Sequence, residues 1–140
     1  MAGFKATKDA IVTILGNVST IGTVYGYPEP SPADWPCAIV VATGGSFEQR
    51  FDNQNNELRM EFKITVMIQL DYTQAKFDLL YEVADAAIAE LRKTSNDTLA
   101  GTVHAFDVAP AIEFVYTTDA AQPTMACTFT VAARKLMSIT

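Results

Sequence analysis

The sequence lacks most of the residues from which catalytic and metal sites are built. It has one histidine, His104, and two cysteines, Cys37 and Cys127, in 140 residues. A lone histidine in a strand is more often a hydrogen-bonded polar residue than a base, and neither cysteine has a histidine near it in sequence. The chain contains no P-loop, G-x-G-x-x-G, G-x-S-x-G or H-E-x-x-H motif. We therefore expect no enzyme activity, no metal and no cofactor.

Long apolar runs and an excess of positive charge are also missing. No run of about 18 apolar residues could span a bilayer, and Lys5, Lys8 and Asp9 interrupt the N-terminal segment that a signal peptide would need. We expect a soluble protein made in the cytoplasm, with no membrane contact. Asp and Glu outnumber Lys and Arg by 16 to 10, giving a net charge of −6. Such a surface repels phosphate backbones, which disfavours nucleic-acid binding but does not exclude a protein that DNA slides past without adhering.

What remains fits one globular domain. Hydrophobic residues make up 49% of the chain, enough for a core, and charged residues only 19%. The length of 140 residues is typical of a single domain, so we expect residues 1–140 to form one unit. Cys37 and Cys127 each lie in an apolar, strand-like run. Two buried reduced thiols are the favoured interpretation, and a disulfide between distant strands is the alternative.

The clearest strand is "MEFKITVMIQL", residues 60–70, in which every even-numbered residue is apolar. Strict alternation of this kind is typical of a strand with one buried face. Residues 46–51 alternate as well, and the segment 52–57, "DNQNNE", has turn chemistry. The sequence therefore predicts a hairpin of 46–51 with 58–70, and we expect a protruding hairpin around 46–66.

Two segments have helical periodicity. In residues 4–18 the side chains of Phe4, Lys8, Ile11, Leu15 and Val18 fall on one stripe. Residues 71–93 place an apolar stripe on one helix face, where Asp71 or Thr73 could cap the helix. That stripe comprises Phe77, Leu80, Tyr81, Ala84, Ile88 and Leu91.

The other segments complete an α+β fold. Four prolines in 24–36 predict an extended connector or a loose loop without a ladder. Strands are expected at 37–43, 103–108, 112–118 and 124–136, with breaks at Gly44-Gly45 and Pro110. The predicted order is α-β-β-β-α-β-β(-β), which describes a mostly antiparallel sheet with a central amphipathic helix and an N-terminal helix packed on one face.

Two groups of side chains are candidates for function. Asp78, Glu82 and Asp85 share one helix face, and we favour a solvated or channel-facing acidic stripe over a metal site or a carboxylate pair for catalysis. Tyr25, Tyr27 and Trp35 could cover the sheet edge of their own subunit. They could also anchor a neighbouring subunit, since Tyr and Trp are enriched in interface cores.

The arrangement resembles the tail terminator (tail completion) proteins of long-tailed bacteriophages and the related neck proteins. The resemblance covers roughly residues 4–135. It lies in an amphipathic helix, the segment "VYGYPEPSPADWPCAIV", the hairpin "GGSFEQRFDNQNNELRMEFKITVMIQ", the helix "AKFDLLYEVADAAIAELRK" and the closing strands. These families share no invariant chemical motif, so no functional residue follows from the resemblance by motif.

The resemblance implies a structural virion protein in the tail-neck region. It would form a homo-oligomeric ring, by analogy a hexamer, that caps the tail tube, ends tube polymerisation and provides the head-attachment surface. Its partners would be the tail-tube protein and a head-side neck or connector protein, while DNA passes through the channel without specific binding. The candidate interface residues then include Phe47, Arg50 and Phe51 of the hairpin besides the aromatic group. A head-side connector, a tail-tube subunit and a small-ligand-binding or enzymatic α+β domain are the alternatives.

Overall fold

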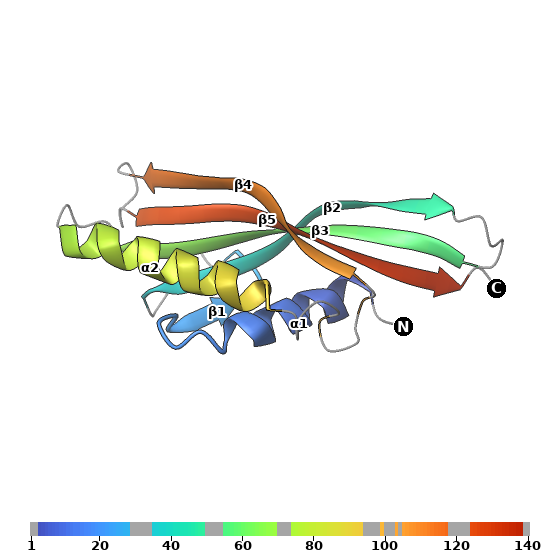
Figure 1. Cartoon of the computed structure of the whole chain (residues 1–140), viewed down its shortest axis with the longest axis horizontal. Coiled ribbons are helices and arrows are strands. Elements are labelled where there is room, and N and C mark those ends of the chain that lie inside the picture. The colour runs from blue at the N-terminus through green and yellow to red at the C-terminus, as the bar shows by residue number, and fades with distance from the viewer. Residues whose placement is uncertain are drawn as a thin grey trace.

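One five-stranded sheet, with strand order β1-β2-β3-β5-β4, organises the chain in a computed structural model (Figure 1). The structure describes residues 3–28, 35–49, 55–69, 74–93, 99, 103, 105–117 and 124–138. The elements in chain order are α1 (Phe4–Leu15), β1 (Thr23–Tyr25), β2 (Cys37–Gln49), β3 (Asn55–Gln69), α2 (Gln74–Leu91), β4 (Ala105–Thr117) and β5 (Thr124–Ser138).

The alternating segment predicted at 60–70 is confirmed as a strand as far as Gln69, and it is the middle strand of the sheet, while Leu70 lies outside the described residues. β3 pairs antiparallel with β2 on one side and with β5 on the other. Its apolar residues point to one face and are buried there, whereas Lys63 and Gln69 are exposed on the other face. The buried set is Leu58, Met60, Phe62, Ile64, Val66 and Ile68. Removing this apolar surface from water is the main stabilising contribution of the strand.

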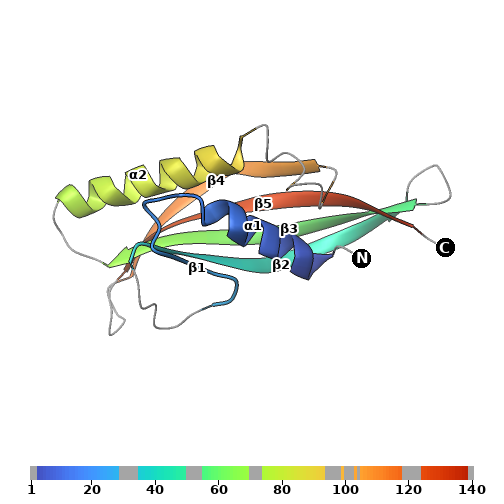
Figure 2. The same cartoon turned by 90° about the horizontal axis from the view of Figure 1, so that it is seen from below.

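Both helices cover the same face of the sheet, as Figures 1 and 2 show from two directions. α1 buries Ile11, Ile14 and Leu15 against the sheet. α2 buries Leu80, Val83, Ala84, Ala87 and Leu91. The predicted α+β class, with two helices on one face of a mostly antiparallel sheet, is confirmed. The predicted stripe of α2 is wrong at Tyr81, which is 42% exposed because it turns toward the edge strand β4 instead of the core.

The predicted break at Gly44-Gly45 is wrong, because β2 runs without interruption from residue 37 to residue 49. The glycines mark a bulge instead: the register with β3 shifts between Ala42 and Gly44. A Cβ atom on Gly45 would lie 2.5 Å from the carbonyl oxygen of Arg59. The strands approach each other too closely there for a side chain, so glycine allows the ladder to continue.

β4 likewise joins two segments that the sequence separates at Pro110. Its register with β5 shifts between Val108 and Ile112, so the proline is accommodated as an irregularity in an edge strand.

The expectation that 24–36 contains no ladder is wrong at its start, where β1 pairs in parallel with residues 37–39 of β2. β1 ends at Tyr25, before Pro28, and residues 29–34 lie outside the described part.

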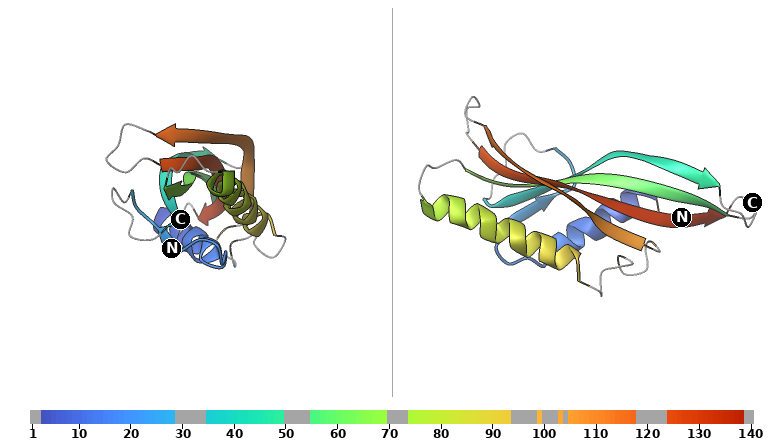
Figure 3. Two further views of the ribbon diagram at one scale, coloured as in Figure 1. Left: turned by 90° about the vertical axis from the view of Figure 1, so that its left-hand side faces the viewer. Right: turned by 45° about the horizontal axis from the view of Figure 1, so that its top comes forward.

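The C-terminal ends of β2 and β5 and the N-terminal end of β3 lie together and extend past both helices, as Figures 1 and 3 show. The extension is three-stranded, because Asn55 of β3 pairs with Ser138 of β5 as well as continuing the hairpin with β2. The pairing of β2 with β3 confirms a hairpin between these segments, but the predicted turn at 52–57 is wrong at its end, because β3 already begins at Asn55. The tip of the hairpin, residues 50–54, lies outside the described residues.

Candidate functional site

The aromatic residues predicted at a subunit interface begin at the end of β1. The rings of Tyr25 and Tyr27 meet edge to face, with centroids 5.7 Å apart. Tyr27 is 54% exposed, whereas Tyr25 and Trp35 are half-buried. The backbone of Phe47 lies in β2, but its side chain is not described. Arg50 and Phe51, like His104, lie outside the described residues.

The acidic residues of α2 are solvated. Asp78, Glu82 and Asp85 are all exposed, on the side of the helix away from the buried stripe. Within the described part of the chain, no group of three or more His, Cys, Asp or Glu side chains is placed to hold a metal ion. The solvated-stripe interpretation is therefore the one that these positions support.

Cys37 and Cys127 are free, buried thiols. They align with neighbouring residues of β3, Met67 and Val66 respectively, so their side chains point to opposite faces of the sheet. Burial raises the pKa of Cys37 to about 11. Burial, together with the charge of Asp85, raises the pKa of Cys127 to about 11. Both thiols stay protonated near neutral pH, which makes them poor nucleophiles and metal ligands.

An exposed apolar surface in the described part of the chain lies on the edge strand β4. We call it the β4 patch: Ile112, Phe114, Val115 and Tyr116, which are between 39% and 46% exposed. Phe114 meets Tyr81 edge to face, and the ring of Tyr116 lies 5.7 Å from that of Phe77. A hydrogen bond with Tyr81 raises the pKa of Tyr116. The α2 aromatics thus hold the patch in place without covering it.

The β4 patch is unusual for the edge of a sheet. Edge strands in monomeric proteins are commonly short, charged or covered, because their free backbone groups can pair with another chain. β4 instead spans 13 residues and presents large apolar side chains on both of its faces. Contiguous exposed apolar surfaces are often sites of association in soluble proteins.

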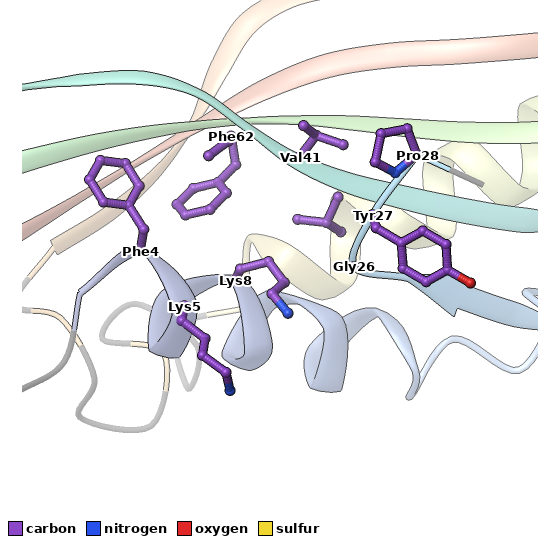
Figure 4. A pocket seen from close by; sticks show the side chains of 10 residues that line it. Phe4, Lys5, Lys8, Gly26, Tyr27, Pro28, Val41 and Phe62 are labelled. Carbon is purple, nitrogen blue, oxygen red and sulfur yellow. The ribbon is translucent and has the colours of Figure 1, made fainter. Parts of the chain in front are cut away.

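A pocket of about 260 Å³ opens between α1 and β2 near the opposite edge of the sheet (Figure 4). Its walls are mainly apolar: Phe4, Gly26, Tyr27, Pro28, Val40, Val41, Ala42 and Phe62. We call it the α1–β2 pocket. Lys5 and Lys8 also line it, and both ammonium groups contact Asp9, at 2.8 Å and 2.7 Å. Hydrogen bonds from Lys5 and then Lys8 lower the pKa of Asp9 to about 2.

Neither the β4 patch nor the α1–β2 pocket was among the predicted sites. A signal for the patch is present in the sequence, because Ala111 and Val115 are apolar as well as Ile112, Phe114 and Tyr116. A segment in which both the odd-numbered and the even-numbered residues are apolar is typical of a strand buried on both faces. The sheet order reverses that reading by placing the segment at an edge. The pocket is lined by residues that lie far apart in sequence, so no local pattern predicts it.

No family model and no curated protein matches this sequence. Among solved structures, the chain is similar to one in the "virion of native gene transfer agent (GTA) particle". That match has a TM-score of 0.42 and 11% sequence identity, and it covers 91% of this chain and 84% of the other. The likeness is one of backbone arrangement alone. Separately, no helix in the described ranges is long and apolar enough to cross a membrane.

Proposed function

We propose that this chain is a structural virion protein that caps a phage tail tube as an oligomeric ring. The ring ends tube polymerisation and provides the surface to which the head attaches. The protein works by binding its partners, and no bond is made or broken. It is synthesised in the host cytoplasm and resides in the tail-neck region of the virion.

The observation that carries this proposal is the β4 patch. Six consecutive residues of this edge strand, 111–116, are all exposed, although Phe114 and Tyr116 contact aromatic residues of α2. Burial of one such large apolar side chain contributes about 1.5–3 kcal/mol. A protein that keeps four of them in water gains most by covering them in an assembly.

A ring needs two different faces on each subunit, so that rotation from one copy to the next returns to the start. The two edges of this sheet differ in this way. One edge is the apolar strand β4, and the other is formed by β1 and β2 beside the α1–β2 pocket. A closed ring then presents its two ends to different partners, the tail-tube protein and a head-side neck or connector protein.

Asp78, Glu82 and Asp85 are proposed to face the channel. All three side chains are exposed to solvent, and an acidic lining repels the phosphate backbone of DNA as it passes. DNA that passes without specific binding needs no side chains that recognise bases, only a surface to which the duplex does not adhere.

A head-side connector or a tail-tube subunit would use the same kind of surface, and differs in how assembly ends. Tube subunits stack into extended polymers, whereas a terminator stops at one ring. A small-ligand-binding domain is the other candidate, but the α1–β2 pocket gives it little support, since its volume of about 260 Å³ lies below the ~300–1,000 Å³ of typical ligand sites.

The test is a tube-capping assay. Purified protein is added to tail-tube subunits during polymerisation, and tube lengths and ends are measured by negative-stain microscopy. A terminator shortens the tubes and decorates one end of each, whereas a tube subunit is incorporated along their length. Light scattering after size-exclusion chromatography gives the oligomeric state. A monomer that also fails to bind tubes would refute the proposal.

A further inference from the structure

We infer that copies of this chain join head to tail by pairing the free edge of β4 in one copy with the free edge of β2 in the next. The sheets of neighbouring copies then continue as one antiparallel sheet. This inference rests on the proposed ring and identifies its subunit interface.

The directions of the strands allow this pairing. β2 is antiparallel to β3, β3 to β5, and β5 to β4. β4 and β2, the long strands at the two sides of the sheet, therefore run in opposite directions. When a rotation about a ring axis relates the copies, β4 of one copy meets β2 of the next in the antiparallel sense, which continues the ladder already present inside each subunit.

Both edges are available over similar lengths. β1 covers β2 only at residues 37–39, so in the described part of the chain residues 40–49 of β2 pair with β3 alone. Among the described residues β4 pairs with β5 alone, and its regular stretch after the irregularity runs from Ile112 to Thr117. Unpaired strand edges gain backbone hydrogen bonds when another strand is added.

The side chains of β4 match the surface beside β2. Ile112, Phe114 and Tyr116 align with Phe129, Cys127 and Met125 of β5, so they lie on the helix-covered face of the sheet. The α1–β2 pocket opens on that same face, next to residues 40–42 of β2, as Figure 4 shows. A β4 strand added at this edge places its apolar side chains at the mouth of the pocket, where they leave water.

Pairing of β4 with its own copy about a two-fold axis is disfavoured by charge. The charged residues of β4 are Asp107 and Glu113, both exposed and both on the face away from the helices. A two-fold pair would bring these carboxylates together with no basic residue on either strand. Beside β2, the same face instead presents the exposed Lys63 of β3, aligned with Val41. Opposite charges on neighbouring strands stabilise a sheet and like charges destabilise it.

Chemical crosslinking tests the pairing directly. Thr43 of β2 and Val115 of β4 are both exposed, and Thr43 adjoins residues 40–42, beside which the added β4 strand is proposed to lie. We propose T43C, V115C and the double variant, treated with a bis-maleimide at increasing protein concentration, with the unmodified protein as the control for the buried native thiols. The double variant should give a ladder of covalent oligomers. A mixture of the two single variants should give dimers only.

A second measurement uses charge at the interface. Ile112→Lys places an ammonium group in the buried part of the proposed contact, yet Ile112 is 46% exposed in the single chain, so the fold should tolerate it. Ala89→Lys adds the same charge at an exposed position of α2 and is the matched control. Light scattering should show that Ile112→Lys raises the concentration of half-assembly by about tenfold or more, equivalent to about 1.4 kcal/mol, and that Ala89→Lys does not.

Several results would overturn the inference. Covalent dimers from V115C alone would show two-fold pairing of β4. Oligomers by light scattering without a ladder from the double variant would place the interface elsewhere, while the proposed ring survived. A chain that stays monomeric at the highest attainable concentration would also refute the pairing, and the tube-capping assay would then decide the proposed function separately.

Discussion

The ring of Tyr81 in α2 meets the ring of Phe114 in β4 edge to face, with centroids 5.3 Å apart and an angle of 84° between the planes. This contact joins the second helix to a strand at the edge of the sheet. The two residues are 42% and 39% exposed, so the pair contacts β4 and leaves it accessible. The same two side chains therefore contribute to the stability of the fold and to the surface proposed for association.

Truncation of this pair should weaken the fold modestly. Tyr81→Ala removes an aromatic contact that contributes about 0.5–1.5 kcal/mol beyond area burial. We expect the free energy of unfolding, measured by urea titration of the monomer at low concentration, to fall by about 1 kcal/mol. Glu82→Ala, at the next helix position, which is also exposed, is the control and should leave the urea midpoint unchanged. An unchanged midpoint for Tyr81→Ala as well would mean that the contact does not stabilise β4.

The two neighbouring glycines of the β2 bulge should respond differently to alanine. A Cβ atom on Gly45 would lie 2.5 Å from the carbonyl oxygen of Arg59 and 3.0 Å from the Phe4 ring, whereas one on Gly44 meets nothing within 4 Å. Gly45→Ala should cost about 1–3 kcal/mol of stability, because the backbone of β3 must shift. Gly44→Ala should change stability by less than about 0.5 kcal/mol. Thermal unfolding of both variants gives the comparison, and equal effects would refute the close approach.

The buried thiols should make stability fall at alkaline pH. The pKa of each thiol is raised from 9.0 to about 11, so between these pH values the thiols keep their protons in the folded protein and lose them in the unfolded chain. This contribution is complete below pH 9 and is lost as the pH rises through about 11. We expect the denaturation midpoint to decrease over that window, and to decrease less in Cys37→Ala.

Native-state labelling provides an independent measurement. A thiol reagent at pH 8 should react with neither cysteine in the folded protein and with both after denaturation, since both are buried and free. Fast labelling of Cys37 or Cys127 without unfolding would contradict their burial.

Neutralising the acidic stripe should leave the fold intact. Asp78→Asn, Glu82→Gln and Asp85→Asn together remove like-charge repulsion between exposed residues at i, i+4 and i, i+3 spacing. That repulsion costs a few tenths of a kcal/mol per pair, so the melting temperature should stay the same or rise slightly. In assembled particles the triple variant should slow DNA release or leave it unchanged. Loss of folding would show that the stripe is structural.

The sequence predicted the elements whose signal is local. The alternation of β3 and the helical period of α1 and α2 identify the segments and most of their buried residues, because each pattern repeats within a few residues. Boundaries were less accurate: Gly44-Gly45 and Pro110 were taken as strand breaks, yet both are irregularities inside continuous strands. A partner strand on one side holds each segment in the ladder despite a residue that disfavours it.

The candidate surfaces were predicted less well. Tyr25, Tyr27 and Trp35 are partly exposed, but the exposed apolar residues of β4 were assigned only to a strand. The reason is that exposure of a strand depends on its place in the sheet. Ile112 would be buried if another strand lay beyond β4, and nothing within residues 105–117 says whether one does.

The amino-acid order by itself determined that this protein has one alternating central strand, two amphipathic helices and no catalytic or metal motif. Those properties follow from side-chain type and spacing along a few turns of chain. Only the tertiary structure decided that β4 and the far part of β2 form the edges of the sheet, and that Tyr81 packs on β4 instead of in the core. Strand neighbours are chosen by contacts between residues far apart in sequence, whose free energy depends on the whole packed arrangement.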